Sequence, residues 1–515
     1  MSEGLSRVGM DNAVISQRMA EGFEDFWLPS LTSPGNPDRM NYLPLGYWIE
    51  SQWYNLFGDN SFMAEKVYSV LTYFIIAVLM LWIWSLYGMP KKTGWIPLLC
   101  WITIPIVSWS ATNNLLESTM TMFILLSVVF LLKSFKISTV IRMHKAVSKP
   151  VACLHLYLAG WLVLAALAME MAFMVKGFSG LFPIVLPLLY WLFLRRDKII
   201  NPIIATAIIV MVWIVTFFTV ILFSPDIYQH LYNYIHHQMI GGLLHVQTVT
   251  SRFYIIYVLV VQLVVPLSII FVLSLIRIKN RPFYRYIFYF RNRKKLTALQ
   301  AEYSSIGWMT FALGLSGILP IMLGFKQHEF YIVPTLPFFA LASACLLYYL
   351  LEDWLAAINK VAQCVLVAMA ILIFGSGLVL NVASIHKINS NETLLGDMKI
   401  ILPFLQQGET VSVSKEVIQN PEVAEYFYRY KQVSFDSMPG QTHLISMFSD
   451  IRYKYNGVCY SDKKLPTQQY RLYELCDLSE PICSTEDLDK ITESTETQSD
   501  SSLHSRLFHP LNINY

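Results

Sequence analysis

Long apolar runs constrain this chain more than any other feature of its sequence. About ten segments are apolar enough, and most are long enough, to cross a bilayer as helices. They cover residues 67–89, 94–110, 115–132, 151–175, 180–194, 199–223, 253–276, 303–323, 331–351 and 361–385. Only 14% of the residues are charged, whereas soluble domains carry about 25%. We therefore predict an all-α polytopic membrane bundle of about ten spans.

Basic residues collect in alternate connections between these runs. Lys91 and Lys92 follow the first run, residues 133–149 follow the third, residues 195–198 follow the fifth, and the basic stretch 277–295 follows the seventh. All four connections lie on one side of the membrane if the runs are spans. Cytoplasmic loops are enriched in Lys and Arg. The chain is thus predicted to place its other connections, its N-terminal residues and its C-terminal region outside the cytoplasm.

Four regions follow from this topology. They are a first extracytoplasmic loop with interfacial helices at 1–66, a transmembrane bundle at 67–385, a small extracytoplasmic α/β domain at 386–484, and a disordered tail at 485–515. Residues 1–66 hold no apolar segment that could carry them across the membrane. We expect an upstream helix to be missing, although later spans can also draw a tail across.

The C-terminal region alternates helix and strand patterns. Residues 399–407 and 420–429 have helical patterns, and 410–413 and 441–447 have the alternation of strands. Three cysteines, Cys459, Cys476 and Cys483, lie in this region. In an oxidising compartment one disulfide among them is expected, and the pairing stays open.

Candidate site residues gather at the predicted outer ends of the spans. Glu117 begins the third run, where a helix N-terminus alone would also favour an acid. Lys326, His328 and Tyr331 form a cluster suited to a phosphate at headgroup depth, although interface anchoring would explain it as well. Glu170 is an ionisable group within a span, and Lys176 at the end of that span could pair with it.

Several short blocks, in order along residues 8–385, resemble a known superfamily. The blocks are Met19-Ala20-Glu21-Gly22, Pro44-Leu45-Gly46-Tyr47-Trp48, Leu56-Phe57-Gly58-Asp59, Asn114-Leu115-Leu116-Glu117, Lys176 to Pro183 and Lys326 to Pro334. Together they resemble the GT-C membrane glycosyltransferases of the aminoarabinose transferase and protein O-mannosyltransferase type. The resemblance implies a bacterial inner-membrane enzyme that passes a sugar from a polyprenyl phosphate to an extracytoplasmic lipid, glycan or protein.

The resemblance also implies roles for particular residues. An acid in the first outer loop would act as base, Glu117 matches the acid of the second, and Lys176, Lys326, His328 and Tyr331 would hold the donor phosphate. The family's first-loop acid is Val8 here, so Asp11, one helical turn later, becomes the candidate. The family's Lys-Pro-Pro-Leu or His-Pro-Pro-Leu is Tyr42-Leu43-Pro44-Leu45 here, so Tyr42 stands in place of the family's cation. No cofactor, metal, nucleotide sugar or nucleic acid is expected.

Two other functions stay open. A transporter or flippase of lipid-linked sugars would use intramembrane charges such as Glu170. A catalytically silent scaffold for envelope partners would explain the changes at Val8 and Tyr42, while the retained Glu117, Lys326 and His328 oppose it.

Overall fold

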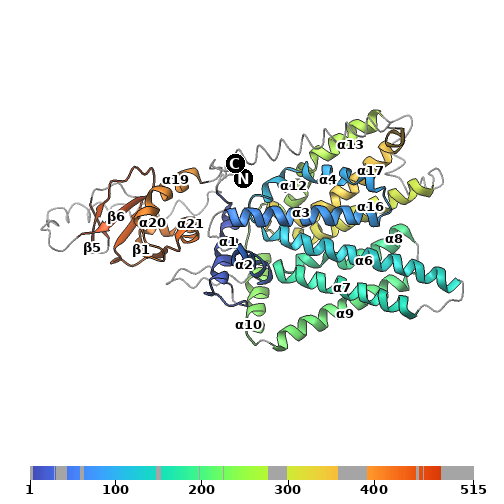
Figure 1. Cartoon of the computed structure of the whole chain (residues 1–515), viewed down its shortest axis with the longest axis horizontal. Coiled ribbons are helices and arrows are strands. Elements are labelled where there is room, and N and C mark those ends of the chain that lie inside the picture. Colours follow the sequence, from blue (N-terminus) through green and yellow to red (C-terminus); the bar gives the residue numbers. More distant parts are fainter. Residues whose placement is uncertain are drawn as a thin grey trace.

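The computed structural model shows a helical bundle with a small sheet domain beyond one end of it (Figure 1). It describes residues 4–27, 29, 43–57, 63–146, 152–195, 198–223, 225–276, 298–357, 391–447, 452–455 and 458–476. The predicted run at 361–385, the predicted tail at 485–515, Tyr42 and Cys483 lie outside these residues.

Six of the described helices have the length and hydropathy to cross a membrane. They are α3 (Met63–Leu86), α6 (Leu116–Ala146), α7 (Ala152–Lys176), α9 (Ile200–Phe223), α16 (Ala298–Ile318, extended by the 3₁₀ turn Leu319–Leu323) and α17 (Leu336–Ala357, preceded by the 3₁₀ turn Glu329–Thr335). The count is seven if α12 (Tyr254–Gln262) and α13 (Val264–Ile276), which meet at a 57° bend, are taken as one span. On α9, Met211, Phe218 and Leu222 expose 57–82% of their surface. Apolar surface of this extent requires lipid, and the chain is an integral membrane protein.

The predicted count of about ten spans is not confirmed. Residues 94–110 form two short helices, α4 (Trp95–Ile102) and α5 (Pro105–Ser110), with Pro105 at the start of the second. Residues 180–194 form the 3₁₀ helix Phe178–Val185 and the short helix α8 (Leu186–Leu194). Proline interrupts both segments because it lacks the backbone N–H that a helix interior needs.

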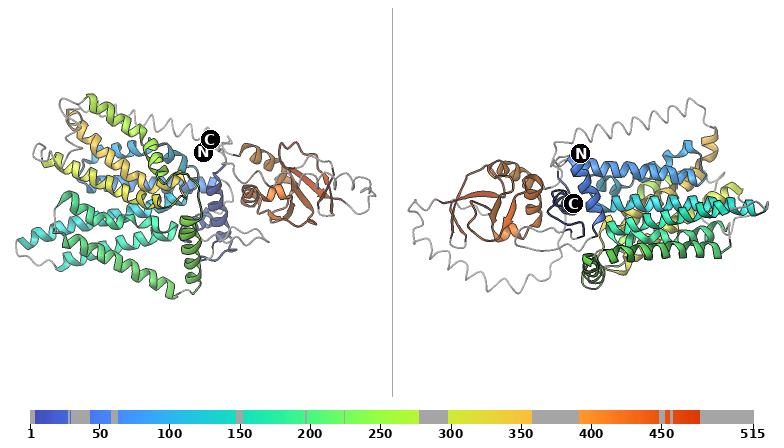
Figure 2. Two further views of the ribbon diagram at one scale, coloured as in Figure 1. Left: turned by 180° about the vertical axis from the view of Figure 1, so that it is seen from behind. Right: turned by 60° about the horizontal axis from the view of Figure 1, so that its bottom comes forward.

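The spans are buried to very different extents. In α17, 83% of the apolar window is buried inside the protein, whereas in α9 the share is 6%. Helix α17 is therefore the most buried of the spans, and α9 lies at the edge of the bundle (Figures 1 and 2). At the end that faces the sheet domain lie α2 (Leu45–Phe57) and the segment of α10 (Pro225–Asn233), the π-helical turn Tyr234–Ile240 and α11 (Gly241–Leu244).

The C-terminal domain is built on a mixed six-stranded sheet in the order β2-β1-β3-β6-β5-β4. Its strands are β1 (Thr410–Val413), β2 (Ser434–Asp436), β3 (His443–Ser446), β4 (Arg452–Tyr455), β5 (Val458–Asp462) and β6 (Arg471–Leu475). Strand β1 is parallel to β2 and β3, and the other pairs are antiparallel. The helices are α19 (Glu392–Ile401), the 3₁₀ turn Leu402–Phe404, α20 (Lys415–Ile418) and α21 (Pro421–Lys431).

The sequence predicted most of this domain's first half. The strands expected at 410–413 and 441–447 are β1 and β3, and the helix expected at 420–429 is α21. The helix expected at 399–407 was wrong in position, because α19 begins at Glu392 and ends at Ile401. Pro403 follows two residues later and cannot continue a helix.

Helix α1 (Arg7–Ala20) joins the two parts of the molecule. Leu5, Met10 and Val14 belong to the apolar core of the sheet domain, while Ile15 belongs to that of the bundle. Tyr426 of α21 donates its hydroxyl to the Leu5 carbonyl at 3.0 Å and accepts from the Leu5 N–H at 3.0 Å. The first helix is thus buried on two sides, between the sheet domain and α2 (Figure 1).

Two of the three C-terminal cysteines lie together. The Sγ atoms of Cys459 and Cys476 are 3.4 Å apart, and the Cys476 N–H donates to the Cys459 carbonyl at 3.0 Å. Both side chains are partly exposed. Strand pairing therefore holds the two thiols in reach of one another.

We predict that Cys459 and Cys476 form a disulfide when the sheet domain matures in an oxidising compartment. Closing a loop of this size should stabilise the domain by about 3 kcal/mol. Peptide mapping under non-reducing conditions checks the bond, with Cys459→Ser as the variant and Cys153→Ser as the control. Full alkylation of both thiols in protein from such a compartment would contradict the prediction.

Candidate active site

An ion pair stands at the end of the bundle nearest α1. Glu117, in the first turn of α6, accepts a hydrogen bond from Lys176, the last residue of α7. Glu117 is 1% exposed and the Lys176 side chain 21%. Among the described residues the second oxygen of Glu117, Oε2, has no hydrogen-bond partner. The pair thus leaves one buried carboxylate oxygen without a hydrogen-bond partner among the described residues.

Three more predicted residues lie beside Lys176. Its Nζ is 5.4 Å from the ring centre of Phe330 and 5.8 Å from that of Tyr331. The His328 ring stacks on Phe330 at 5.3 Å and meets Tyr331 edge-on at 5.2 Å. Lys326 lies close enough to His328 for its charge to lower the pKa of His328, and close enough to Lys176 for the charge of Lys176 to lower the pKa of Lys326. The structure therefore brings together Glu117, Lys176, Lys326, His328 and Tyr331, and we name these five residues the outer cluster.

A buried glutamine fixes the loop that carries Lys326 and His328. The Gln327 amide donates to the carbonyls of Arg252 and Gly324 at 3.0 and 2.9 Å, and its Oε1 accepts from the Ile255 N–H at 3.0 Å. Thr248 also accepts from the Gln327 N–H at 2.9 Å. The loop is thereby held to the segment before α12, and its two basic residues have defined positions.

A glycine lets the chain turn directly after Lys176. Gly177 has a φ of +85°, in the left-handed region, and a Cβ there would lie 1.7 Å from the Tyr234 hydroxyl. Residues with a side chain disfavour this backbone conformation. Gly177 thus allows α7 to end at the position that points Lys176 toward Glu117.

Burial and neighbouring positive charges lower the pKa values of two basic residues in the outer cluster. Burial lowers the pKa of Lys326, and the charge of Lys176 lowers it further. Burial, Lys326 and Lys176 together lower the pKa of His328. An anion bound among these groups would reverse both effects, because an opposite charge favours the protonated forms. The outer cluster is suited to binding an anion.

Asp11 lies on a different face of α1 and is not among these residues. Gly9, Asn12 and Ser16 share the face toward the bundle, where the Asn12 amide donates to the Asn114 carbonyl at 3.0 Å. The Asp11 carboxyl instead faces Glu425 of α21, with Arg7 nearby. Burial raises the pKa of both acids, and Asp11 raises that of Glu425 further. The side chain of Val8, at the position of the family's acid, is partly buried.

Glu170 does not pair with Lys176. Within the described part of the chain neither Glu170 oxygen has a hydrogen-bond partner, and the residue is 7% exposed on α7. Lys176 makes its ion pair with Glu117 instead.

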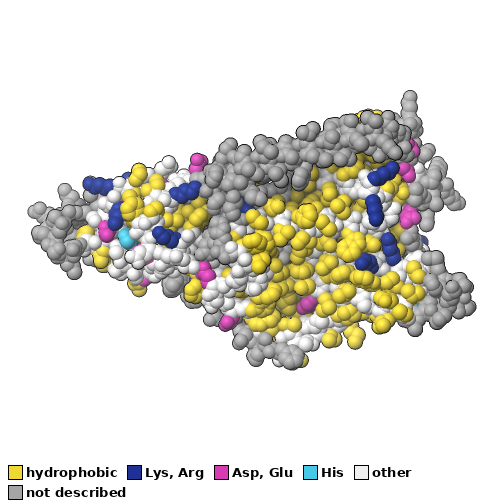
Figure 3. Space-filling view, viewed as in Figure 1, with side chains coloured by type: hydrophobic (Ala, Val, Ile, Leu, Met, Phe, Trp, Pro, Cys, Tyr) yellow, Lys and Arg dark blue, Asp and Glu magenta, His cyan; other side chains and the backbone are white. Residues whose placement is uncertain are grey.

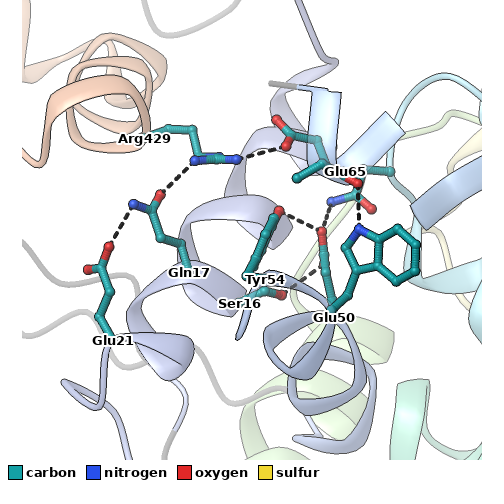
Figure 4. Close-up of polar contacts among 10 residues, drawn as sticks. Ser16, Gln17, Glu21, Glu50, Tyr54, Glu65 and Arg429 are labelled. Atoms are coloured by element: carbon teal, nitrogen blue, oxygen red, sulfur yellow. Dashed lines mark hydrogen bonds and ion pairs between the residues drawn. The ribbon is translucent and has the colours of Figure 1, made fainter. Parts of the chain in front are cut away.

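Sequence reasoning missed a second acid close to the outer cluster. Glu50 of α2 is fully buried and accepts hydrogen bonds from Ser16 at 2.8 Å, Tyr54 at 2.9 Å and the Asn114 amide at 2.6 Å (Figure 4). Asn114 itself has a φ of 50° and lies three residues before Glu117. Glu50 therefore holds the turn from which α6 and Glu117 start. The one sequence signal was Asn113-Asn114, which favours such a turn.

A buried ion pair, also missed, fastens the sheet domain to the bundle. Arg429 of α21 binds Glu65 of α3 at 2.8 Å, with side chains 1% and 0% exposed. The Arg429 guanidinium also donates to the side-chain amide oxygen Oε1 of Gln17 at 3.2 Å and lies 5.1 Å from the ring centre of Tyr54 (Figure 4). Residues separated by more than 360 positions in the chain meet here, and no local pattern predicts such a pair.

We predict that Glu50 makes the stability of the protein fall as the pH rises. Burial raises the pKa of Glu50 to about 7 from 4.5, so the folded state favours the protonated acid. This stabilisation is complete below about pH 4.5 and is lost as the pH passes 7; it amounts to about 3 kcal/mol. Thermal unfolding in detergent at about pH 5 and pH 8 checks it. Glu50→Gln should remove most of the pH dependence, and Glu474→Gln on the exposed sheet should retain it; equal curves for Glu50→Gln and wild type would refute it.

Comparison with known proteins finds similar solved structures but no matching family model. No protein-family model and no curated protein matches the chain. It is similar to the crystal structure of ArnT from Cupriavidus metallidurans bound to undecaprenyl phosphate, with 16% identity and a TM-score of 0.47 over 78% of this chain and 62% of that one. It is also similar to the archaeal oligosaccharyltransferase AglB from Archaeoglobus fulgidus in complex with an inhibitory peptide and a dolichol-phosphate, with 13% identity and a TM-score of 0.43 over 86% and 66%.

Both of these structures are of GT-C glycosyltransferases. The chain spans less than two thirds of the length of each. At these TM-scores the likeness assigns no role to any residue, and the roles proposed below rest on the geometry of the outer cluster.

Proposed function

We propose that this protein is a membrane glycosyltransferase that moves a sugar from a polyprenyl phosphate to an acceptor on the side of the sheet domain. One observation carries the proposal. Glu117, with one unused carboxylate oxygen, is linked by Lys176 to a group of basic and aromatic side chains at the end of the bundle. A transfer enzyme of this kind needs a base for the acceptor and cations for the leaving phosphate.

The chemistry assigns a part to each group. Glu117 Oε2 takes the proton of the acceptor hydroxyl, whose oxygen attacks the anomeric carbon of the sugar. The bond from this carbon to the phosphate oxygen breaks, its electron pair stays on the phosphate, and the configuration at the carbon inverts. Lys326, His328 and Lys176 stabilise the negative charge that develops there, and the Tyr331 ring borders the same space.

Glu117 is our first candidate for the base, and Asp11 is the second. Asp11 faces Glu425, so it would have to leave this neighbour to reach an acceptor held at the outer cluster. Burial raises the pKa of Asp11, and Asp11 would share a proton with Glu425. Both effects keep Asp11 protonated and make it a weaker base at neutral pH. The active protein would lie in a bacterial inner membrane with its sheet domain outside.

One structural observation favours transport as a second candidate. Glu170 is a buried acid within a span whose oxygens have no partner among the described residues. Such acids mark ion or substrate paths in transporters. It is the one acid of α7, however, whereas five residues converge at the outer cluster.

Transfer from a defined donor tests the proposal. Membranes or liposomes containing the protein would receive radiolabelled polyprenyl-phosphate sugars and an extract of envelope glycans, lipids and proteins. We expect label to move to the acceptor fraction with release of polyprenyl phosphate. Movement of intact donor across the liposome membrane without release would favour the transporter, and neither result with any donor would favour the silent scaffold.

A further inference from the structure

A large cavity opens at the end of the bundle remote from the sheet domain. Its volume is about 740 Å³, and α6, α7, α8 and the start of α9 line it. On α6 the lining begins at Ser134, which lies 17 residues after Glu117. At a rise of 1.5 Å per residue this is about 26 Å along the helix. The cavity is thus separate from the outer cluster.

Basic and polar groups line one part of this cavity. His155 of α7, Arg195 after α8 and Lys198 before α9 supply up to three positive charges, and Ser138 and Asn201 supply further polar groups. Among the described lining residues there is no carboxylate. Helix α9 also begins here, at Ile200, and the N-terminus of a helix favours negative charge. An anion, rather than a cation, fits this part.

Apolar and aromatic side chains line the rest. Phe135 of α6, Leu162 of α7, Tyr190 of α8 and Ile208 of α9 border the cavity from four helices. Leu162 and Ile208 lie seven residues along their helices from His155 and Asn201, which is about 10 Å deeper in the bundle. The cavity therefore has a charged mouth and an apolar interior.

The surface around the cavity places its mouth at the edge of the lipid. Apolar side chains cover the visible face of the bundle, and Lys and Arg side chains gather at the end away from the sheet domain (Figure 3). Only 6% of the apolar window of α9 is buried inside the protein, so much of this helix faces lipid. A lipid in the membrane can thus meet the charged and the apolar parts of the cavity at the same time.

We propose that this cavity binds an anionic phospholipid, with its phosphate at Arg195, Lys198 and His155 and an acyl chain between α6, α7, α8 and α9. A guanidinium and an ammonium form charge-assisted hydrogen bonds to phosphate oxygens. The acyl chain would pack against α9, which makes few contacts with the rest of the bundle. The ligand chemistry is a phosphate ester, and the apolar interior favours a lipid over free phosphate. This proposal is independent of the glycosyltransferase function.

Native mass spectrometry of the purified full chain tests the site. The protein would be equilibrated with phosphatidylglycerol, with phosphatidylcholine or with inorganic phosphate, and the retained molecules counted. We expect one phosphatidylglycerol to be retained at least tenfold better than phosphatidylcholine. Arg195→Gln combined with Lys198→Gln should lower this retention at least tenfold, whereas the control Lys91→Gln with Lys92→Gln, at the same end but outside the cavity, should not change it.

Two further measurements keep the test decisive. Ala205→Trp should fill the apolar interior and remove the retained lipid while the charges stay in place. If the double variant does not fold, this variant and His155→Asn carry the test. Equal retention of both phospholipids, or equal losses in the control variant, would overturn the site. Displacement of the lipid by millimolar inorganic phosphate would overturn its assignment to a lipid.

Discussion

Replacing Glu117 by glutamine is expected to lower the rate of sugar transfer by about 10²- to 10⁴-fold, the range that a positioned general base contributes. The substitution keeps the shape of the side chain and a hydrogen-bond acceptor for Lys176, but removes the charge that draws the acceptor's proton. The initial rate with saturating donor measures the effect, and thermal unfolding shows whether the variant folds.

Asp11→Asn is the matched comparison, because it neutralises the other candidate acid at the face toward Glu425. With Glu117 as the base, Asp11→Asn should retain transfer within a few-fold. If Asp11→Asn abolishes transfer and Glu117→Gln does not, the base is Asp11 and the role given to Glu117 is wrong.

Replacing Arg429 by alanine is expected to destabilise the attachment of the sheet domain by about 3–5 kcal/mol, since it leaves Glu65 charged and buried without its partner. It also removes the guanidinium from Gln17 and from the Tyr54 ring. Thermal unfolding in detergent, together with proteolysis between the bundle and the sheet domain, measures the change.

The control is Lys463→Ala, which breaks the surface pair with Glu474, whose side chains are 25% and 48% exposed. Exposed pairs contribute about 0–1 kcal/mol, so this variant should resemble wild type. Combining Arg429→Met with Glu65→Gln should recover part of the loss, because neither charge is then left alone. Equal stability of Arg429→Ala and Lys463→Ala would show that the buried ion pair does not hold the domain.

The sequence predicted the parts of this protein that depend on local pattern. The long apolar runs became α3, α6, α7, α9, α16 and α17, because a helix in lipid satisfies its own backbone and needs only length and apolar side chains. The runs containing Pro105 or Pro183 and Pro187 were identified as apolar but broke into short helices. Hydropathy indicates whether a segment lies in lipid or in water, and it does not indicate where a helix breaks.

Some residues of the candidate site could likewise be predicted from local pattern, and others could not. Glu117, Lys176, Lys326, His328 and Tyr331 all lie at helix ends or in short connections, so the predicted order of spans was enough to bring them to one end of the bundle. The contacts of α1 required a partner more than 400 residues away, such as Tyr426 for Leu5. For that reason the orientation of Asp11 toward Glu425, and the roles of Glu50 and Arg429, could not be read from spacing.

A structure of the protein with bound polyprenyl phosphate would show whether the outer cluster holds the donor phosphate. We expect phosphate density in contact with Lys326 and His328, near Lys176, with the prenyl chain leaving along the outside of the bundle. Phosphate density away from the outer cluster, at the Arg195 and Lys198 cavity or on the sheet domain, would contradict it.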